Sequence, residues 1–125
     1  MNSNIKSIPH NEHRYETVGD YWLDEKGVTQ FRVSDMGNED YHFLVGIHEL
    51  VEEYMTRKRG IKETDIKAFD EAFEAKRAPG NTDEPGDDPA APYRKEHRFA
   101  ENIERQIALE LGVDWAEYTR AVESL

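Results

Sequence analysis

The stretch EDYHFLVGIHELVEEYMTRKRG, residues 39–60, decides the fold class because it has the clearest helical periodicity in the chain. Its apolar residues recur with helical spacing, with further apolar neighbours beside them: Phe43, Ile47, Leu50 and Tyr54, flanked by Leu44, Val51 and Met55. Gly60 is the residue type expected just past the end of a helix. We predict a helix over residues 39–59 whose apolar face, centred near Ile47, packs on the core.

Weaker signals on both sides of this helix complete the fold class. Residues 15–23 and 28–34 are β-prone and are separated by the turn sequence DEKG, which predicts a hairpin. A second helix is expected from a Thr64 cap to about Arg77, a third from Pro92 to just before Gly112, and a short fourth after Asp114. The predicted class is α+β, mostly helical, with three to four helices and one N-terminal β-hairpin packed on them.

The chain has the length of one domain, with two less regular segments. Residues 1–14 show little periodicity and are expected to be a loosely ordered arm, so the single globular domain spans residues 15–125. Residues 79–91 are expected to be a surface loop without a regular element. Its acids lack the spacing of a calcium-binding EF-hand loop, and we expect them to be solvated: Asp83, Glu84, Asp87 and Asp88.

The composition excludes several classes of protein. With 16 Lys and Arg against 27 Asp and Glu, the net charge is −11, which argues against a nucleic-acid partner. There is no Cys, so a disulfide or thiolate metal site is excluded. The longest apolar run, residues 43–47, is far shorter than the roughly 20 residues of a membrane span, and no signal peptide is recognised. We expect a cytoplasmic protein, with an unknown protein or small molecule as its partner.

The residues best suited to chemistry lie on two of the predicted helices. His48 and Glu52 are four residues apart and so lie on one side of a helix. His97 lies on the third predicted helix, followed by Glu101 and Glu104. If the two helices pack together, His48, Glu52 and His97 converge as metal ligands, with Glu101 or Glu104 as a fourth ligand or a hydrogen-bonding partner. Two imidazoles and one carboxylate suit zinc best, and also suit iron, manganese or nickel.

A different interpretation makes these histidines incidental. A histidine at the border of a helix often hydrogen-bonds a solvated carboxylate four residues on. The protein would then be a non-enzymatic interaction or structural protein that uses its acidic surface. Three further histidines are expected to be surface or packing residues rather than ligands: His10, His13 and His42.

The run His48-Glu49-Leu50-Val51-Glu52 resembles the H-E-x-x-H helix of zincin metallopeptidases. In that family the first His and the residue four positions later bind zinc, and the intervening Glu polarises the attacking water. The resemblance implies that His48 is a ligand and Glu49 the general base. Glu52 stands where the family has its second His, so the ligand set departs from the family pattern.

A series of short motifs also runs through most of the chain: TVGDYW (17–22), IHELVE (47–52), EPGD (84–87), APY (91–93), His97, IER (103–105) and LGVDW (111–115). Together they resemble a group of small uncharacterised proteins of bacteriophages and prophages. This resemblance implies a phage-type origin, and the host cytoplasm as location, but no established activity.

A third comparison is with the helical nucleotide pyrophosphohydrolases, which bind magnesium through E-x-x-E on one helix and E-x-x-D on the next. Glu49 with Glu52 or Glu53 provides the first half. The following helix has only Asp70, Glu71 and Glu74, without the second motif. We rank this function below the histidine-containing site because it leaves His48 and His97 without a role.

Overall fold

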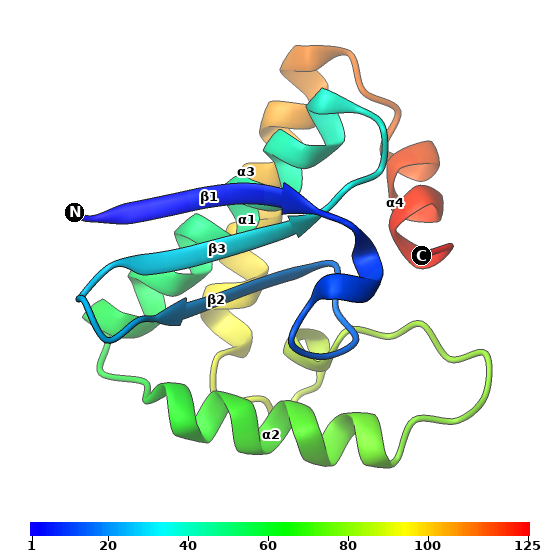
Figure 1. Cartoon of the computed structure of the whole chain (residues 1–125). Helices are drawn as coiled ribbons and strands as arrows, with labels where there is room; N and C mark the ends of the chain where they lie inside the picture. The colour runs from blue at the N-terminus through cyan, green and yellow to red at the C-terminus, as the bar shows by residue number, and fades with distance from the viewer.

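The computed structural model describes residues 1–125 as a three-stranded sheet packed against helices (Figure 1). The strands are β1 (Ser3–Ile8), β2 (Gly19–Leu23) and β3 (Thr29–Ser34). The helices are α1 (Glu39–Lys58), α2 (Glu63–Ala75), α3 (Arg94–Leu111) and α4 (Trp115–Glu123), with two short 3-10 turns, η1 (His10–Glu12) and η2 (Pro85–Asp87). The predicted α+β class is confirmed.

The sheet is larger than the predicted hairpin. β3 lies in the centre, antiparallel to β2 and parallel to β1. β1 falls in the segment expected to be a loosely ordered arm. Its register pairs Ser3 with Thr29 and Ile8 with Ser34, and such a pairing between distant segments leaves no local periodicity to read. Most of β1 is exposed, which also explains its weak apolar signal.

The element ends follow local chemistry. Asn38 caps α1 by accepting from the backbone N–H of Tyr41, and Asp114 caps α4 by accepting from that of Glu117. α3 ends at Gly112, which adopts the left-handed conformation with φ of 70°. α2 begins at Glu63, just before the predicted Thr64 cap. No helix is both long and apolar enough to span a membrane.

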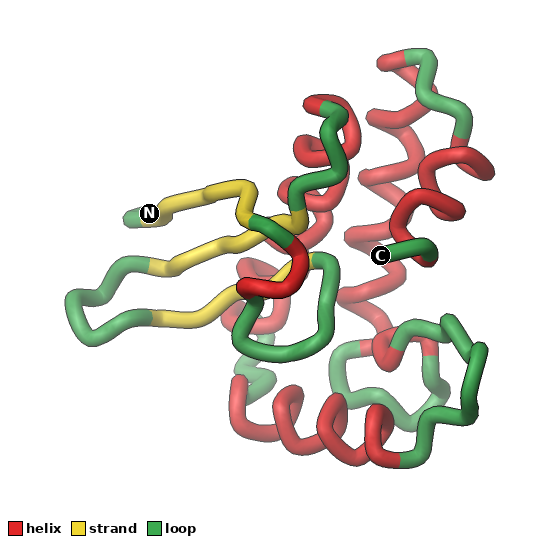
Figure 2. Tube along the Cα trace, turned by 45° about the vertical axis from the view of Figure 1, so that its right-hand side comes forward, coloured by secondary structure: helices red, strands yellow, loops and turns green.

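The helix α1 lies between the sheet and α3. It packs on β2 and β3 through one side and on α3 through another, and Figure 2 shows the three layers in this order. α2 runs below the sheet, and α4 folds back beside the far end of α3 (Figure 1). The loop with η2 contacts α2 and α3.

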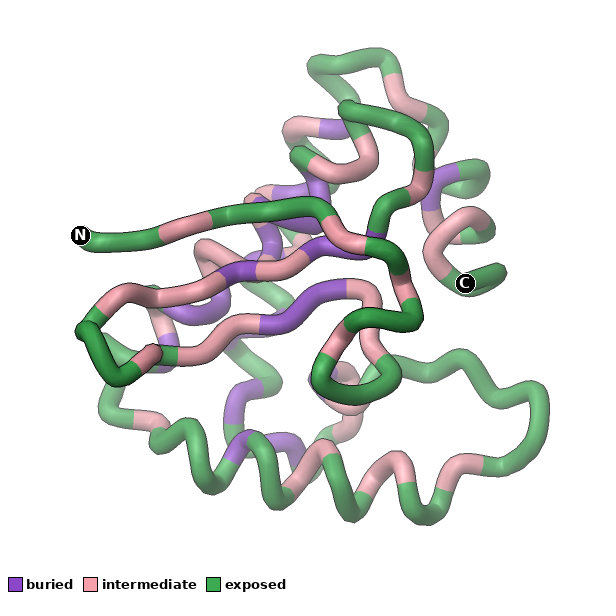
Figure 3. Tube along the Cα trace, viewed as in Figure 1, coloured by how far each residue is buried: buried purple, intermediate pink, exposed green.

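The buried side of α1 differs from the predicted apolar face. Phe43 and Tyr54, at the ends of the predicted stripe, are 51% and 38% exposed. The buried residues of α1 instead include both apolar and polar side chains: Leu44, Val45, Gly46, His48, Glu52, Glu53 and Thr56. Figure 3 shows the buried part of this helix behind the strands. Contact with two layers turns the helix so that the polar border of the predicted stripe becomes internal.

The core contains almost as many polar as apolar residues. Of the buried side chains, ten are hydrophobic and nine are polar or charged. The apolar ones form two separate clusters, one of Val33, Leu44, Val45, Ala108 and Tyr118 and one of Ile66, Ala91 and Tyr93. Buried polar groups need hydrogen bonds or ions to offset their lost hydration, so this polar part of the core is the place to search for function.

Candidate metal centre

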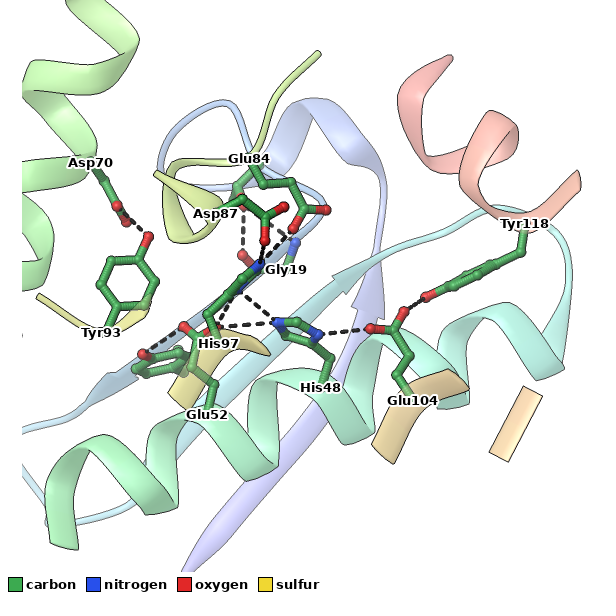
Figure 4. A network of polar contacts seen from close by, with 12 residues as sticks. Gly19, His48, Glu52, Asp70, Glu84, Asp87, Tyr93, His97, Glu104 and Tyr118 are labelled. Atoms are coloured by element: carbon green, nitrogen blue, oxygen red, sulfur yellow. Dashed lines mark hydrogen bonds and ion pairs between the residues drawn. The ribbon is translucent and has the colours of Figure 1, made fainter. Parts of the chain in front are cut away.

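Three predicted ligands meet in the polar part of the core (Figure 4). Nε2 of His48 lies 3.1 Å from Oε2 of Glu52 and 3.2 Å from Nδ1 of His97. Nδ1 of His97 is 2.9 Å from the same Glu52 oxygen. All three residues are buried, with exposed fractions of 5–8%. We call His48, Glu52 and His97 the triad.

Two helices and one loop position the triad. The four-residue spacing on α1 stacks His48 and Glu52 on one side of the helix, and the packing of α1 on α3 brings in His97. The η2 turn packs directly against the His97 ring. A Cβ atom added at Gly86 would lie 2.4 Å from Cγ of His97, so only glycine allows this approach.

The predicted residue Glu104 supports the triad from outside. Nδ1 of His48 donates to Oε1 of Glu104 over 2.7 Å, and the hydroxyl of Tyr118 donates to Oε2 over 2.5 Å. With Nδ1 engaged by Glu104, Nε2 is the nitrogen of His48 that faces the triad. A carboxylate on the outer nitrogen of a histidine is the usual support of a metal ligand. Glu104 therefore hydrogen-bonds His48 without joining the triad, which is the hydrogen-bonding role of the two roles that we expected for it.

A second tyrosine supports the carboxylate of the triad. The hydroxyl of Tyr21, on β2, donates to Oε1 of Glu52 over 3.1 Å. The other oxygen of this carboxylate, Oε2, faces both histidines. Each member of the triad is thus approached by a group from a different element.

Nε2 of His97, the ring nitrogen that faces away from the triad, has different surroundings from Nδ1 of His48. Nε2 lies 2.9 Å from Oε2 of Glu84 and 3.6 Å from Oδ1 of Asp87, yet it forms no hydrogen bond. Oδ1 of Asp87 is also buried without a hydrogen bond. The expectation that Glu84 and Asp87 are merely solvated is therefore wrong, because the η2 turn directs both toward the ring.

The carboxylates strongly affect protonation of the triad. Burial opposes the charged form of His48, but Glu104 and Glu52 outweigh it and raise its pKa well above the usual value. For His97, Glu52 and Glu84 likewise outweigh burial and raise the pKa to about 10. Burial would raise the pKa of Glu52, but the two histidines lower it to about 2. Without a cation, protons on the rings balance the carboxylates.

Glu49 lies next to the triad, against β2. Its carboxylate packs on Gly19, where an added Cβ would be 2.5 Å from Oε1 and 2.7 Å from Cγ of Glu49. It is half-buried and has no hydrogen bond or ion pair. Burial, together with the charge of Glu52, raises the pKa of Glu49 to about 8. Such a pKa suits a group that exchanges protons near neutral pH.

The dimensions of the triad fit a metal ion. Zinc binds His nitrogen and carboxylate oxygen at about 2.0–2.2 Å, so two ligand atoms of one tetrahedral ion lie about 3.3–3.6 Å apart. The three triad edges of 2.9, 3.1 and 3.2 Å are all somewhat shorter than this range. The shorter edges correspond to ligands on one octahedral face, an arrangement that iron and manganese also accept.

The other candidate residues lie outside the triad. Glu101 is half-buried on α3 and forms no hydrogen bond or ion pair. His10 and His13 contact Oγ of Ser34 at 2.8 and 2.9 Å, and His42 accepts from the backbone N–H of Met36.

The acids considered for a magnesium site are also engaged elsewhere. Asp70 accepts from Tyr93 over 2.5 Å. Glu74 pairs with Arg77 at 2.8 Å, and Glu71 lies 3.9 Å from Lys67. The acids of α2 therefore do not join Glu49 and Glu52.

Several residues of the site were missed from the sequence. Tyr21, Tyr118, Gly19 and Gly86 lie on other elements, and only the assembled fold brings them to the triad. The one usable signal was the dipeptide Pro85-Gly86 between two acids, which indicates a tight turn with carboxylates on both sides.

Comparison of the chain with protein families, with curated proteins and with solved structures finds no match. The resemblances to zincin metallopeptidases and to small phage proteins therefore stay predictions. The class of site defined by the residues is a buried cluster of two histidines and one carboxylate, supported by further carboxylates.

Proposed function

We propose that this protein binds a divalent cation, zinc in the first place, through Nε2 of His48, Oε2 of Glu52 and Nδ1 of His97. The observation that carries the proposal is the triangle of ligand atoms, with edges of 2.9–3.2 Å, inside the core. Glu104 supports it further, because its hydrogen bond holds the His48 ring with the other nitrogen free for a cation.

The proposed activity is hydrolysis by a cation-activated water. Three protein ligands leave a position for water on zinc, and zinc lowers the pKa of bound water to about 7. Glu49 is the proposed general base. Its support is its place one residue after a ligand, its missing hydrogen bonds and its pKa of about 8.

The first experiment measures metal binding. Protein purified without an affinity tag is stripped with a chelator, loaded with zinc and analysed for metal content. We expect a stoichiometric cation at the triad that is lost in His48→Gln and kept in His42→Gln, a control on the same helix. Zinc at about 100 times its dissociation constant stabilises a protein by about 2.7 kcal/mol, so the thermal midpoint rises and chelator reverses the rise. Absence of bound zinc in the parent protein would overturn the proposal.

The second experiment separates catalysis from binding. Zinc-loaded protein is assayed with chromogenic phosphodiester, ester and anilide substrates. We expect Glu49→Gln to keep its zinc and to lose hydrolysis by about 100-fold or more, whereas Glu101→Gln keeps both. Equal hydrolysis by Glu49→Gln and the parent would contradict the role of Glu49.

A structural cation is the second candidate function. It is favoured by the burial of the triad, whose three residues are only 5–8% exposed. The cation would then join α1 to α3. This alternative predicts the same zinc binding and thermal stabilisation, but no hydrolysis with any of the substrates.

A further inference from the structure

The two imidazoles of the triad differ on their outer sides. Nδ1 of His48 donates to Glu104, whose second oxygen is occupied by Tyr118. Nε2 of His97 has no hydrogen bond, although its side chain is only 6% exposed and two carboxylates face it. The outer side of His97 therefore has the features of a binding position, whereas that of His48 is complete.

We infer that Nε2 of His97, Oε2 of Glu84 and Oδ1 of Asp87 form a second cation site, so that the His97 ring bridges two cations. The bridge rests on the proposed function, because Nδ1 of the same ring is a ligand of the first cation. A ring that binds a cation at each nitrogen has released both ring protons to solvent, and the carboxylates on both sides balance the charge.

The distances support this second site. Nε2 is 2.9 Å from Glu84 and 3.6 Å from Asp87, and ligand atoms of one cation lie about 2.8–3.1 Å apart in an octahedral site and about 3.3–3.6 Å apart in a tetrahedral one. Asp87 offers an oxygen that is buried and lacks a hydrogen bond. Nη1 of Arg98 is 3.7 Å from this oxygen, too far for a hydrogen bond. The Arg98 side chain is exposed and can turn into solvent when a cation arrives.

The second site is partly exposed to solvent, whereas the triad is buried. The side chains of Glu84 and Asp87 are 50% and 39% exposed, so a hydrated cation can reach them and keep water ligands. Gly86 lets the turn that carries both acids lie directly on the His97 ring. A cation can thus enter at the η2 turn.

The local charge also favours two cations. Four carboxylates face the two imidazoles: Glu52, Glu84, Asp87 and Glu104. One divalent cation balances two of these charges and a second balances two more. Uncompensated charge in the core is costly, so the acid excess is better matched by two cations than by one.

The test is the zinc stoichiometry of tag-free protein and four variants, each separated from free metal by gel filtration. We expect two zinc ions in the parent protein and one in Glu84→Gln and in Asp87→Asn. The control Asp83→Asn, in the same loop but not directed at His97, keeps two. Both acids are partly exposed, so these variants retain the fold. The fourth variant, His48→Gln, removes a ligand of the first site alone and keeps one zinc.

The outcomes distinguish the two proposals. One zinc in the parent, lost in His48→Gln and unchanged in Asp87→Asn, overturns the second site and leaves the proposed function standing. One zinc that is lost in Asp87→Asn but kept in His48→Gln overturns the proposed function instead. No bound zinc in the parent overturns both.

The bridge itself has a spectroscopic test with copper as the probe. Cu²⁺ binds nitrogen and oxygen sites more tightly than zinc does. Two Cu²⁺ ions joined through one imidazole couple their spins, so we expect the paramagnetic resonance signal to fall as the second equivalent binds, and to persist in Asp87→Asn. Two equivalents that give two uncoupled signals would overturn the bridge.

Discussion

Nδ1 of His48 and Oε1 of Glu104 lie 2.7 Å apart in the core, although 56 positions separate the two residues in the chain. The contact joins α1 to α3, and Tyr118 extends it to α4. A hydrogen bond between a histidine and a carboxylate fixes which ring nitrogen is protonated and thus which one is free to bind a cation. This pair therefore sets the orientation of the His48 ring within the triad.

Replacing Glu104 by Gln is expected to weaken zinc binding by about 10–100-fold, because loss of such a supporting carboxylate lowers the basicity and the order of the ligand. A competition titration against a coloured chelator measures the affinity. Glu101→Gln, on the same helix but without a contact to His48, is the matched control and should bind zinc like the parent. Equal affinity of both variants would show that Glu104 does not support the site.

Gly19→Ala is expected to destabilise the fold by about 1–3 kcal/mol, because the new Cβ would lie 2.5 Å from Oε1 and 2.7 Å from Cγ of Glu49. Chemical denaturation of the metal-free protein measures the change. Gly46→Ala is the control, since its Cβ would meet Ile5 and Val33 at ordinary distances of 3.9 and 4.0 Å. In the middle of α1 this alanine should stabilise by about 0.5–1 kcal/mol. If Gly19→Ala leaves the free energy of unfolding unchanged, the packing of Glu49 on Gly19 is contradicted.

Metal-free protein is expected to lose stability from about pH 6.5 to about pH 10 through His97. Its pKa is raised to about 10 in the fold from 6.5, so the protonated ring stabilises the native state. This contribution is complete below pH 6.5 and disappears as the pH rises through 10. Denaturation in chelator should show that the advantage of the parent over His97→Asn shrinks by more than about 1 kcal/mol across this range.

The affinity for zinc is expected to change with pH in the opposite direction to the stability of the metal-free protein. Since the cation replaces protons on the rings, its affinity increases with pH over the interval in which the metal-free protein weakens. Calorimetry in buffers of different ionisation enthalpy measures the protons released. Zinc binding without proton release would contradict ligation by His48 and His97.

A second titration, away from the triad, involves Asp70. Burial is the main cause that raises its pKa from 3.8 to about 6, against the hydrogen bond from Tyr93. The native state therefore favours the protonated acid, and its contribution to stability falls as the pH rises from 3.8 to 6 and is constant above that. Comparison with Asp70→Asn over this range isolates the effect, which should be about 1–2 kcal/mol. A pH-independent difference between the two proteins would contradict it.

The helices and the pairing of His48 with Glu52 could be predicted because both depend on short spacings in the sequence. The pattern of α1 and the cap at Asp114 are local, and His48 with Glu52 is a four-residue spacing. The meeting of these two candidate ligands with His97 needed only the assumption that the two helices that carry them pack together, and they do.

The rest depended on contacts between distant segments. β1 pairs with a strand 26 positions later, so its few apolar residues gave no sign of a strand. The apolar stripe through Phe43 and Tyr54 predicts the core face of α1, but the helix buries the polar border of this stripe between two layers instead. The direction of Glu84 and Asp87 follows from where η2 lies on α3, which the composition of an acidic loop cannot reveal.

The division of the apolar core into two clusters has a consequence for how the molecule opens. α2 is attached mainly through the small cluster around Ile66 and Tyr93 and through the bond between Tyr93 and Asp70. The sheet, α1 and α4 share the other cluster, around Leu44 and Tyr118. Backbone amides of α2 should therefore exchange with solvent by partial unfolding, before the sheet opens, and a cation bound at His97, four residues from Tyr93, would slow that exchange.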